Sequence, residues 1–305
     1  MRVFITGGTG FVGCNLVQRL VDHGHRVSVI TRSRVAGQML PPEVSLVEGN
    51  PSAPGKWQEI VPEHEVIINL AGRSIFTLWT AKTRQEIISS RVSITRNLAG
   101  ALQGAQPGTV LISTSAVGYY GSTDDDRELI ESSPPGNDFL AEVGRVWEAE
   151  ARRAESFGVR VVTCRFGVVL GRNGGALEKM VPAFRSYLGS PLGSGKQWFS
   201  WIHMEDILGI MEFLMKNREV TGPVNCTAPH PVCNRELTET LAKVLGRPLI
   251  LPSVPGFLLR ILLGDFANVL LGGQRVIPRR LVDAGYRFQF PTLEKALKDL
   301  VANIM

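Results

Sequence analysis

Three glycines at intervals of three, Gly7, Gly10 and Gly13, lie in the stretch ITGGTGFVG near the start of the chain. An apolar run, residues 2–6, precedes them, and a helix-like pattern follows. Glycines at this spacing let the backbone turn tightly and approach a pyrophosphate, which the free N–H groups of a helix N-terminus then bind. A tight turn alone would use glycines for their positive φ but would not explain three of them leading a helix. The pattern therefore predicts a dinucleotide-binding turn.

The end of the second apolar run, VITRSR at residues 29–34, indicates which dinucleotide is bound. Sites for NAD usually carry an acidic residue here, which binds the 2′-hydroxyl of the adenosine ribose. Thr31 and Arg32 stand at this position instead, and no acidic residue occurs between Asp22 and Glu43. Because a guanidinium matches a 2′-phosphate, we expect NADP(H) as the cofactor. The alternative is a pair of solvated surface arginines.

Strand and helix patterns alternate over the first part of the chain. Apolar runs that predict strands lie at residues 2–6, 26–31, 65–72, 109–116 and 160–171. Helical patterns separate them, the longest at residues 84–102 and 139–157. Strands that alternate with long helices predict parallel crossovers, so we expect an α/β fold with a Rossmann-type doubly wound parallel sheet.

The second half of the chain has a looser pattern, rich in glycine and proline, with helical patterns near 204–216 and 234–245. We therefore expect an NADP-binding domain of residues 1–171, to which segments around 195–230 return. Residues 172–305 would form a smaller C-terminal lobe for the substrate. Such a lobe would lie over the carboxyl ends of the strands, where open α/β sheets bind their ligands.

The composition is that of an ordinary globular protein, with 44% hydrophobic and 20% charged residues. A formal net charge of +5 mildly favours an anionic ligand. No run of five like charges occurs in the chain, so we expect no nucleic-acid partner.

The four cysteines are scattered along a chain that opens without a signal peptide, so we expect reduced thiols and a cytoplasmic protein. Cys226 and Cys233, in CTAPHPVC, lack a partner pair at zinc-site spacing, so we expect no metal. The longest apolar stretch, residues 249–271, is interrupted by two prolines and two charged residues. It predicts an amphipathic helix and no membrane span.

Several motifs resemble one known superfamily in the same order. TGGTGFVG resembles the glycine turn of extended short-chain dehydrogenases, and NLAG (69–72), ISTSAVGYYG (112–121) and RFGVVLG (165–171) are similar to later segments of that family. VGYYG, the WE pair at 147–148, the SWIH segment and GQRVIP more narrowly resemble the atypical NADP-dependent epimerase-family group, and the resemblance covers essentially the whole chain. It implies NADP(H), a small-molecule substrate that the sequence does not identify, a small C-terminal domain of about residues 248–305 and a homodimer.

The resemblance also implies cofactor contacts position by position. The glycine turn would wrap the pyrophosphate, the segment 113–115 would approach the nicotinamide ribose, and the segment 165–169 would pass the carboxamide. Arg91 stands where extended members have an asparagine, so its cation is expected to reach the cofactor phosphates, oriented by Glu86. The complete implied set is Gly7, Gly10, Phe11, Val12, Gly13, Thr31, Arg32, Leu70, Ala71, Gly72, Glu86, Arg91, Ser113, Arg165 and Val169.

The catalytic pair of this superfamily is missing from the sequence. Its reductases use a tyrosine acid, a lysine four residues later that lowers the pKa of the tyrosine, and a serine that holds the substrate oxygen. Taking Ser115 as that serine places Phe139 at the tyrosine position and Val143 at the lysine position. No Tyr-x-x-x-Lys occurs anywhere in the chain. The standard proton relay is therefore absent.

Three functions stay open, because a fold does not set a function. The first is an NADP(H)-dependent oxidoreductase or epimerase with a relocated acid, for which Ser115 and Tyr119 are the catalytic candidates. Tyr120, Glu142 and His203 are further candidates for the proton donor. The second is a cofactor-binding protein without turnover that senses the redox state of NADP. The third is a pseudoenzyme that uses the fold as an interaction surface.

Overall fold

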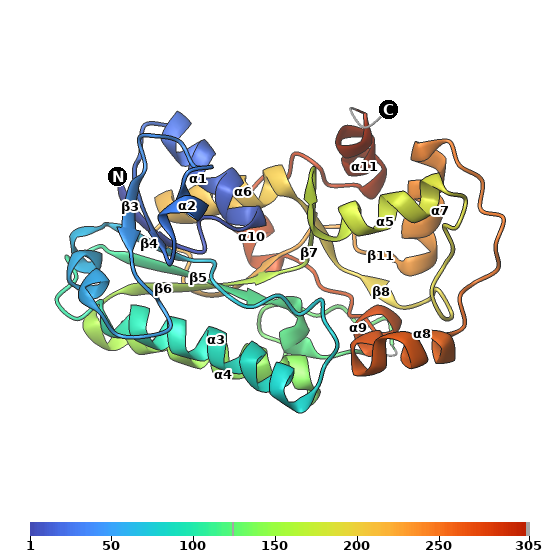
Figure 1. Ribbon diagram of the computed structural model, residues 1–305, viewed down its shortest axis with the longest axis horizontal. Coiled ribbons are helices and arrows are strands. Elements are labelled where there is room, and N and C mark those ends of the chain that lie inside the picture. Colours follow the sequence, from blue (N-terminus) through green and yellow to red (C-terminus); the bar gives the residue numbers. More distant parts are fainter. Residues whose placement is uncertain (124, 303–305) are drawn as a thin grey trace.

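A computed structural model describes residues 1–123 and 125–302, apart from the side chains of Arg34 and Ala36. Within this part, seven parallel strands form the main sheet in the order β3-β2-β1-β4-β5-β6-β10 (Figure 1). These strands are β1 (Arg2–Thr6), β2 (Arg26–Thr31), β3 (Ser45–Glu48), β4 (Val66–Asn69), β5 (Val110–Ala116), β6 (Arg160–Phe166) and β10 (Gly222–Cys226). The order reverses between β1 and β4, which is the switch point at which doubly wound sheets bind ligands. The predicted Rossmann-type fold is confirmed.

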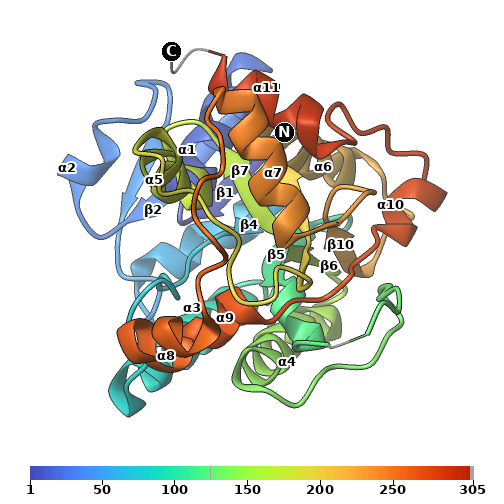
Figure 2. The ribbon, with the colours of Figure 1, turned by 90° about the vertical axis from the view of Figure 1, so that its right-hand side faces the viewer.

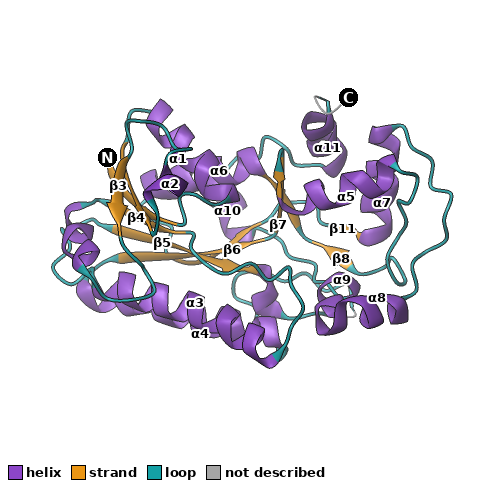
Figure 3. Cartoon of the chain, in the orientation of Figure 1, coloured by secondary structure: helices purple, strands orange, loops and turns teal. Residues whose placement is uncertain are grey.

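Helices cover both faces of this sheet (Figure 3). One face carries α1 (Phe11–Asp22) and α6 (Met204–Lys216), and the other carries α3 (Ala81–Gly100), α4 (Phe139–Arg152) and the 3-10 helix η3 (Arg153–Phe157). Because both faces are covered, the central strands are apolar along their whole length, and β4 reads VIIN with every residue buried. Each layer contributes its own buried cluster to the core.

The remaining elements are short. The helices are α2 (Arg34–Gly37), α5 (Gly175–Arg185), α7 (Asn234–Leu245), α8 (Gly256–Leu263), α9 (Ala267–Leu271), α10 (Arg279–Asp283) and α11 (Leu293–Val301), with 3-10 turns η1 (Lys56–Glu63), η2 (Val117–Tyr120) and η4 (Gly264–Phe266). Two small sheets join β7 (Val168–Gly171) to β9 (Trp201–His203), and β8 (Trp198–Phe199) to β11 (Val232–Cys233).

A second lobe lies beyond the carboxyl ends of the strands, and Figure 2 views the molecule from the side of this lobe. Its helices α5, α7 and α11 enclose a core of their own, which includes Leu177, Leu241 and Leu297. The chain nevertheless returns to the main sheet, because β10 pairs with β6. The expected division between residues 1–171 and 172–305 stays a prediction.

Two local features differ from what the sequence predicted. The strand expected at 160–171 is two strands: the first ends at Phe166, and β7 leaves the main sheet to pair with β9. Gly167 permits this, because a Cβ there would lie 2.7 Å from the carbonyl oxygen of Ser200. The connection before residue 65 contains β3 and η1, which the sequence analysis did not predict.

The apolar stretch of residues 249–271 forms the short helices α8 and α9. In α8, Leu259 is buried whereas Phe257 and Ile261 are exposed. No helix among the described residues is long and apolar enough to cross a membrane.

Candidate functional site

The glycine turn between β1 and α1 has no room for side chains. Gly7 has a φ of +74°, and a Cβ there would lie 2.7 Å from the backbone of Leu70. A Cβ on Gly13 would lie 2.8 Å from the Cα of Gly8 and would overlap the carbonyl oxygen of Gly7. Gly10 caps α1 with extended backbone, so the helix N-terminus opens at the switch point of the sheet. This geometry fits a pyrophosphate, since a helix N-terminus offers N–H groups without an intrahelical partner and these glycines carry no Cβ that would keep a ligand away.

The carboxyl end of β2 presents Arg32 at the surface. The buried side chain of Thr31 fixes the turn that follows, because its Oγ1 donates to the carbonyl oxygen of Ser33 at 2.9 Å and accepts from the Ser33 N–H at 3.3 Å. Arg32 is exposed on this turn. A guanidinium in this position suits a 2′-phosphate on an adenosine that lies across the end of β2.

A buried polar network supports the loop of Leu70, Ala71 and Gly72 after β4. The Asn69 side chain accepts from Thr6 Oγ1 at 2.7 Å and donates to Thr95 Oγ1 at 2.9 Å and Ser113 Oγ at 3.1 Å. Ser113 is buried, so its hydroxyl serves this network. Sequence reasoning missed Asn69 and Thr95 as supports. A signal existed for Asn69, because a polar residue ends the apolar run of β4, as Thr6 ends that of β1.

Arg91 lies beside this loop. Its guanidinium lies 5.0 Å from the centre of the Trp147 ring, and a Cβ on Gly72 would lie 3.4 Å from its Cζ. Burial lowers the pKa of Arg91 to about 10. The structure does not show the expected orienting contact from Glu86, because Glu86 pairs instead with Arg73 of the loop after β4, at 3.1 Å.

The most buried charges near the end of β5 are Arg165 and Glu148. The Arg165 Nε donates to Glu148 Oε1 at 2.7 Å, and its Nη2 donates to Glu148 Oε2 at 2.9 Å. Burial opposes the charged guanidinium, but its hydrogen bonds to Glu148 and Tyr120 outweigh this and raise the pKa of Arg165. The Ser115 hydroxyl also donates to Glu148, at 2.8 Å. Ser115 is only 1% exposed, so in this structure its hydroxyl helps to hold Glu148.

The two tyrosines of η2 have different surroundings. Tyr120 is buried, accepts from Arg165 at 2.8 Å and donates to Asn225 Oδ1 at 2.7 Å. Burial raises the pKa of Tyr120 to about 12, so this tyrosine is a structural group. The Tyr119 ring lies on the Arg165 guanidinium, 3.5 Å from its Cζ, and the structure records no hydrogen bond between the Tyr119 hydroxyl and any described residue.

The positions of the missing catalytic pair are filled by packing. Phe139 lies edge-on to Trp79 with ring centres 5.0 Å apart, and Val143 is buried between α4 and its neighbours. The further candidates also have other roles. Glu142 points to solvent from α4. His203 is buried, stacks on Phe290, and accepts from the backbone N–H of Glu205 as the N-cap of α6.

Phe11 and Val169 connect the glycine turn to the second lobe. The Phe11 ring lies against Gly171, Gly174 and Gly175, where any Cβ would overlap it. Val169 pairs with Ile202 in the small sheet of β7 and β9, and both Phe11 and Val169 pack against the core under α1. The half-buried Val12 packs against the same core.

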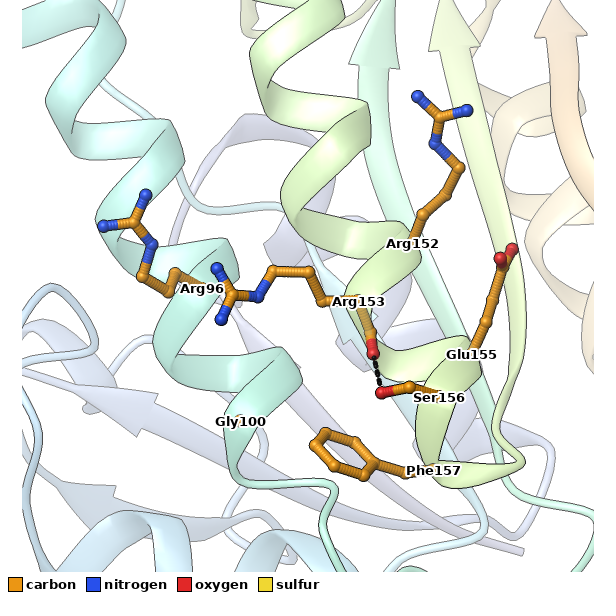
Figure 4. A pocket seen from close by; sticks show the side chains of 7 residues that line it. All are labelled: Arg96, Gly100, Arg152, Arg153, Glu155, Ser156 and Phe157. Carbon is orange, nitrogen blue, oxygen red and sulfur yellow. Dashed lines mark hydrogen bonds between the residues drawn. The ribbon is translucent and has the colours of Figure 1, made fainter.

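A shallow pocket lies at the C-terminal ends of α3 and α4, as Figure 4 shows, and Arg96, Arg152 and Phe157 are among its lining residues. These helix ends lie at the amino edge of the sheet, opposite the glycine turn. The pocket is therefore separate from the candidate cofactor site. Among the described residues, no group of three histidine, cysteine or acidic side chains is placed to hold a metal.

The fold and this site define a dinucleotide-binding α/β protein in which Phe139 and Val143 fill the positions of the usual tyrosine–lysine pair. Residues 3–226 match the family model described as the NAD dependent epimerase/dehydratase family, and the chain belongs to that family. Residues 254–300 match a domain of unknown function, DUF1731.

Curated relatives resemble the chain over its whole length. The chloroplastic homologue of epimerase family protein SDR39U1 from Arabidopsis thaliana is 41% identical over 305 residues, which cover 99% of this chain and 87% of the relative. Epimerase family protein YfhF from Bacillus subtilis is 38% identical over 305 residues, which cover 99% of this chain and 99% of the relative.

Solved structures extend the comparison. Human epimerase family protein SDR39U1, crystallised with NADPH, superimposes with a TM-score of 0.86 at 35% identity, covering 99% of this chain and 100% of that one. The UDP-glucose 4-epimerase of Thermus thermophilus, in complex with NAD, gives a TM-score of 0.75 at 17% identity, covering 99% of this chain and 98% of that one. At this low identity, the second comparison shows the fold alone.

Proposed function

We propose that this chain is an NADPH-dependent oxidoreductase or epimerase that acts on a small-molecule substrate. The observation that carries the proposal is the glycine turn without room for side chains, with the exposed Arg32 at the adenosine end. The human relative at 35% identity, crystallised with NADPH, supports the same cofactor. When bound, the cofactor would supply a hydride in a reduction, or accept and return one in an epimerisation, and the protein must bind it, orient it and transfer a proton.

The proton donor that we propose is Tyr119. It lies on η2 directly after β5, at the edge of the sheet where ligands bind. The buried pair of Arg165 and Glu148 holds its ring in place from below. Proton donation by a side chain requires that its hydroxyl be held in a fixed place, which this stacking on Arg165 provides. Ser115 would help to position Tyr119 indirectly, because its hydroxyl holds Glu148, which in turn holds Arg165 under the ring.

Cofactor choice is tested by titrating NADPH and NADH against the wild-type protein and the Arg32→Ala variant. We expect Arg32→Ala to weaken NADPH binding by roughly tenfold to a hundredfold and to leave NADH binding unchanged, because a charge-assisted contact is lost. Arg26→Ala, which removes an exposed arginine at the other end of β2, is the matched control. Equal affinity of the wild-type protein for NADH and NADPH would overturn the cofactor assignment.

Turnover is tested by following NADPH oxidation with a panel of carbonyl compounds, and by following the configuration of nucleotide sugars incubated with the protein and NADP⁺, because an epimerase leaves its cofactor unchanged overall. We expect Tyr119→Phe to abolish turnover of any substrate found and to leave NADPH affinity intact. Tyr187→Phe, at an exposed tyrosine on the second lobe, is the control. Unchanged turnover in Tyr119→Phe would exclude this tyrosine as the donor.

A second candidate function is an NADP(H)-binding protein without turnover, which senses redox state or holds a partner. The observation that favours it is the packing of Phe139 and Val143, which leaves α4 without a tyrosine–lysine pair. Tight NADPH binding with neither oxidation of the cofactor nor epimerisation of any nucleotide sugar in the panel would support this function over the first.

A further inference from the structure

Arg91 is a largely enclosed cation without a protein anion. The structure records one hydrogen bond for its guanidinium, from Nη1 to the carbonyl oxygen of Ile87 at 3.1 Å, and no ion pair with any described carboxylate. Arg165 and Arg84, by contrast, pair with Glu148 and Asp265. A guanidinium carries five N–H donors. Burial lowers the pKa of Arg91, so the cost of enclosing this charge is not offset by the protein.

The location of the guanidinium indicates the source of the missing anion. Arg91 contacts Gly72 in the loop after β4. The same loop lies directly against Gly7, where a Cβ would be 2.7 Å from the backbone of Leu70. The open donors of Arg91 are therefore next to the loop that borders the glycine turn.

Side chains from three elements, α4, α3 and β4, support the Arg91 guanidinium. The Trp147 ring on α4 carries the guanidinium, and its Nε1 donates to Thr95 Oγ1 on α3 at 2.9 Å. Thr95 Oγ1 also accepts from Asn69 at the end of β4. Trp147 follows Val143 by four residues, so both lie on one face of α4. The Arg91 guanidinium therefore lies against the same face of α4 that carries the position where a lysine is missing.

We propose that Arg91 supplies from α3 the positive charge that the missing lysine would supply from α4. It binds the nicotinamide half of NADPH, through the nicotinamide ribose and the adjacent phosphate, and Trp147 acts as its positioning residue. The inference rests on the proposed binding of NADPH.

The test compares two probes, NADPH and adenosine 2′,5′-bisphosphate, which retains the adenosine and the 2′-phosphate but lacks the nicotinamide half. We expect Arg91→Met to weaken NADPH binding by roughly tenfold to a hundredfold and to leave bisphosphate binding unchanged. Arg91→Lys keeps the positive charge and should therefore lose less NADPH affinity than Arg91→Met. Arg96→Met is the control on the same helix, since Arg96 is exposed and pairs with Glu150. Arg32→Ala should weaken both probes.

Variants of Trp147 test whether this residue positions Arg91 or only stabilises the fold. Trp147→Phe keeps a ring under the guanidinium and should keep NADPH affinity, whereas Trp147→Leu should lower NADPH affinity without changing bisphosphate affinity. A merely structural role of Trp147 would weaken both probes together. Circular dichroism and thermal unfolding of each variant establish that it is folded.

Two results would overturn the inference. Equal weakening of both probes by Arg91→Met would place the guanidinium at the adenosine half, and no weakening of either would remove Arg91 from the cofactor site. Both results leave wild-type NADPH binding in place, so they refute only this inference. A wild-type protein that binds neither probe would refute the proposed function as well.

Discussion

Replacing Glu148 with leucine should measure how strongly the buried ion pair holds β5, β6 and α4 together. The side chains of Arg165 and Glu148 are 3% and 5% exposed, and their two hydrogen bonds measure 2.7 and 2.9 Å. Removing one partner of such a pair leaves an uncompensated buried charge, which costs about 3–5 kcal/mol. At about 2.1 cal/mol/K per residue, the 305 residues have an unfolding entropy of roughly 0.6 kcal/mol/K. The Tm should therefore fall by about 5–8 °C.

The assay is a double-mutant cycle of Glu148→Leu, Arg165→Met and the double variant. Thermal unfolding gives the change in Tm, and denaturant unfolding gives the free energy of unfolding. The double variant should be more stable than the sum of the single losses predicts, because two apolar side chains of similar volume leave no charge uncompensated. A double variant that loses the full sum of both single effects would refute the coupling between these side chains.

Three further predictions follow from other contacts. Gly13→Ala should abolish NADPH binding in a titration, because its Cβ would overlap the glycine turn, whereas Gly100→Ala, where an added Cβ would meet nothing beyond its own helix within 4 Å, should bind normally. Burial raises the pKa of Glu131 above 4.5, so the folded state holds this proton more tightly than the unfolded state. The free energy of unfolding should thus decrease as pH rises from about 4.5 through the raised pKa, and Glu131→Gln should remove that decrease in unfolding measured from pH 4 to 8. Asp265→Asn, which breaks the exposed pair with Arg84, should change the free energy of unfolding by less than about 1 kcal/mol.

Each of these predictions can fail in a distinct way. Normal NADPH affinity in Gly13→Ala would mean that the cofactor does not approach this turn. An unchanged pH dependence in Glu131→Gln would mean that another group titrates. A loss in Asp265→Asn as large as that in Glu148→Leu would contradict the ranking of the two ion pairs by burial.

The sequence predicted the first half of the fold closely. The apolar runs at 2–6 and 26–31 coincide with β1 and β2, because a strand covered on both faces needs a continuous apolar run. The alternation of strands and long helices was enough to predict the parallel sheet. Strands with weaker patterns, such as β3 and β10, were not predicted individually, since their pairing with neighbours decides their conformation.

The sequence by itself also determined the pyrophosphate end of the candidate site. The conformational freedom of Gly7 and the absence of side chains at Gly10 and Gly13 are properties of the residues themselves. Arg32 became a candidate for the adenosine end because of its place at the end of a strand, which the sequence alone shows.

Only the tertiary structure decided which polar side chains meet at the end of the candidate site that lies away from the glycine turn, near Tyr119. Glu148 meets Ser115 and Arg165, which come from two different strands. Arg91 meets Trp147 on another helix, while Glu86, expected to orient it, pairs with Arg73. Periodicity along the chain shows which face of an element is buried, but contacts between elements depend on how the layers pack. That is why the glycine turn could be predicted from the sequence, whereas the arrangement of charges around Tyr119 could not.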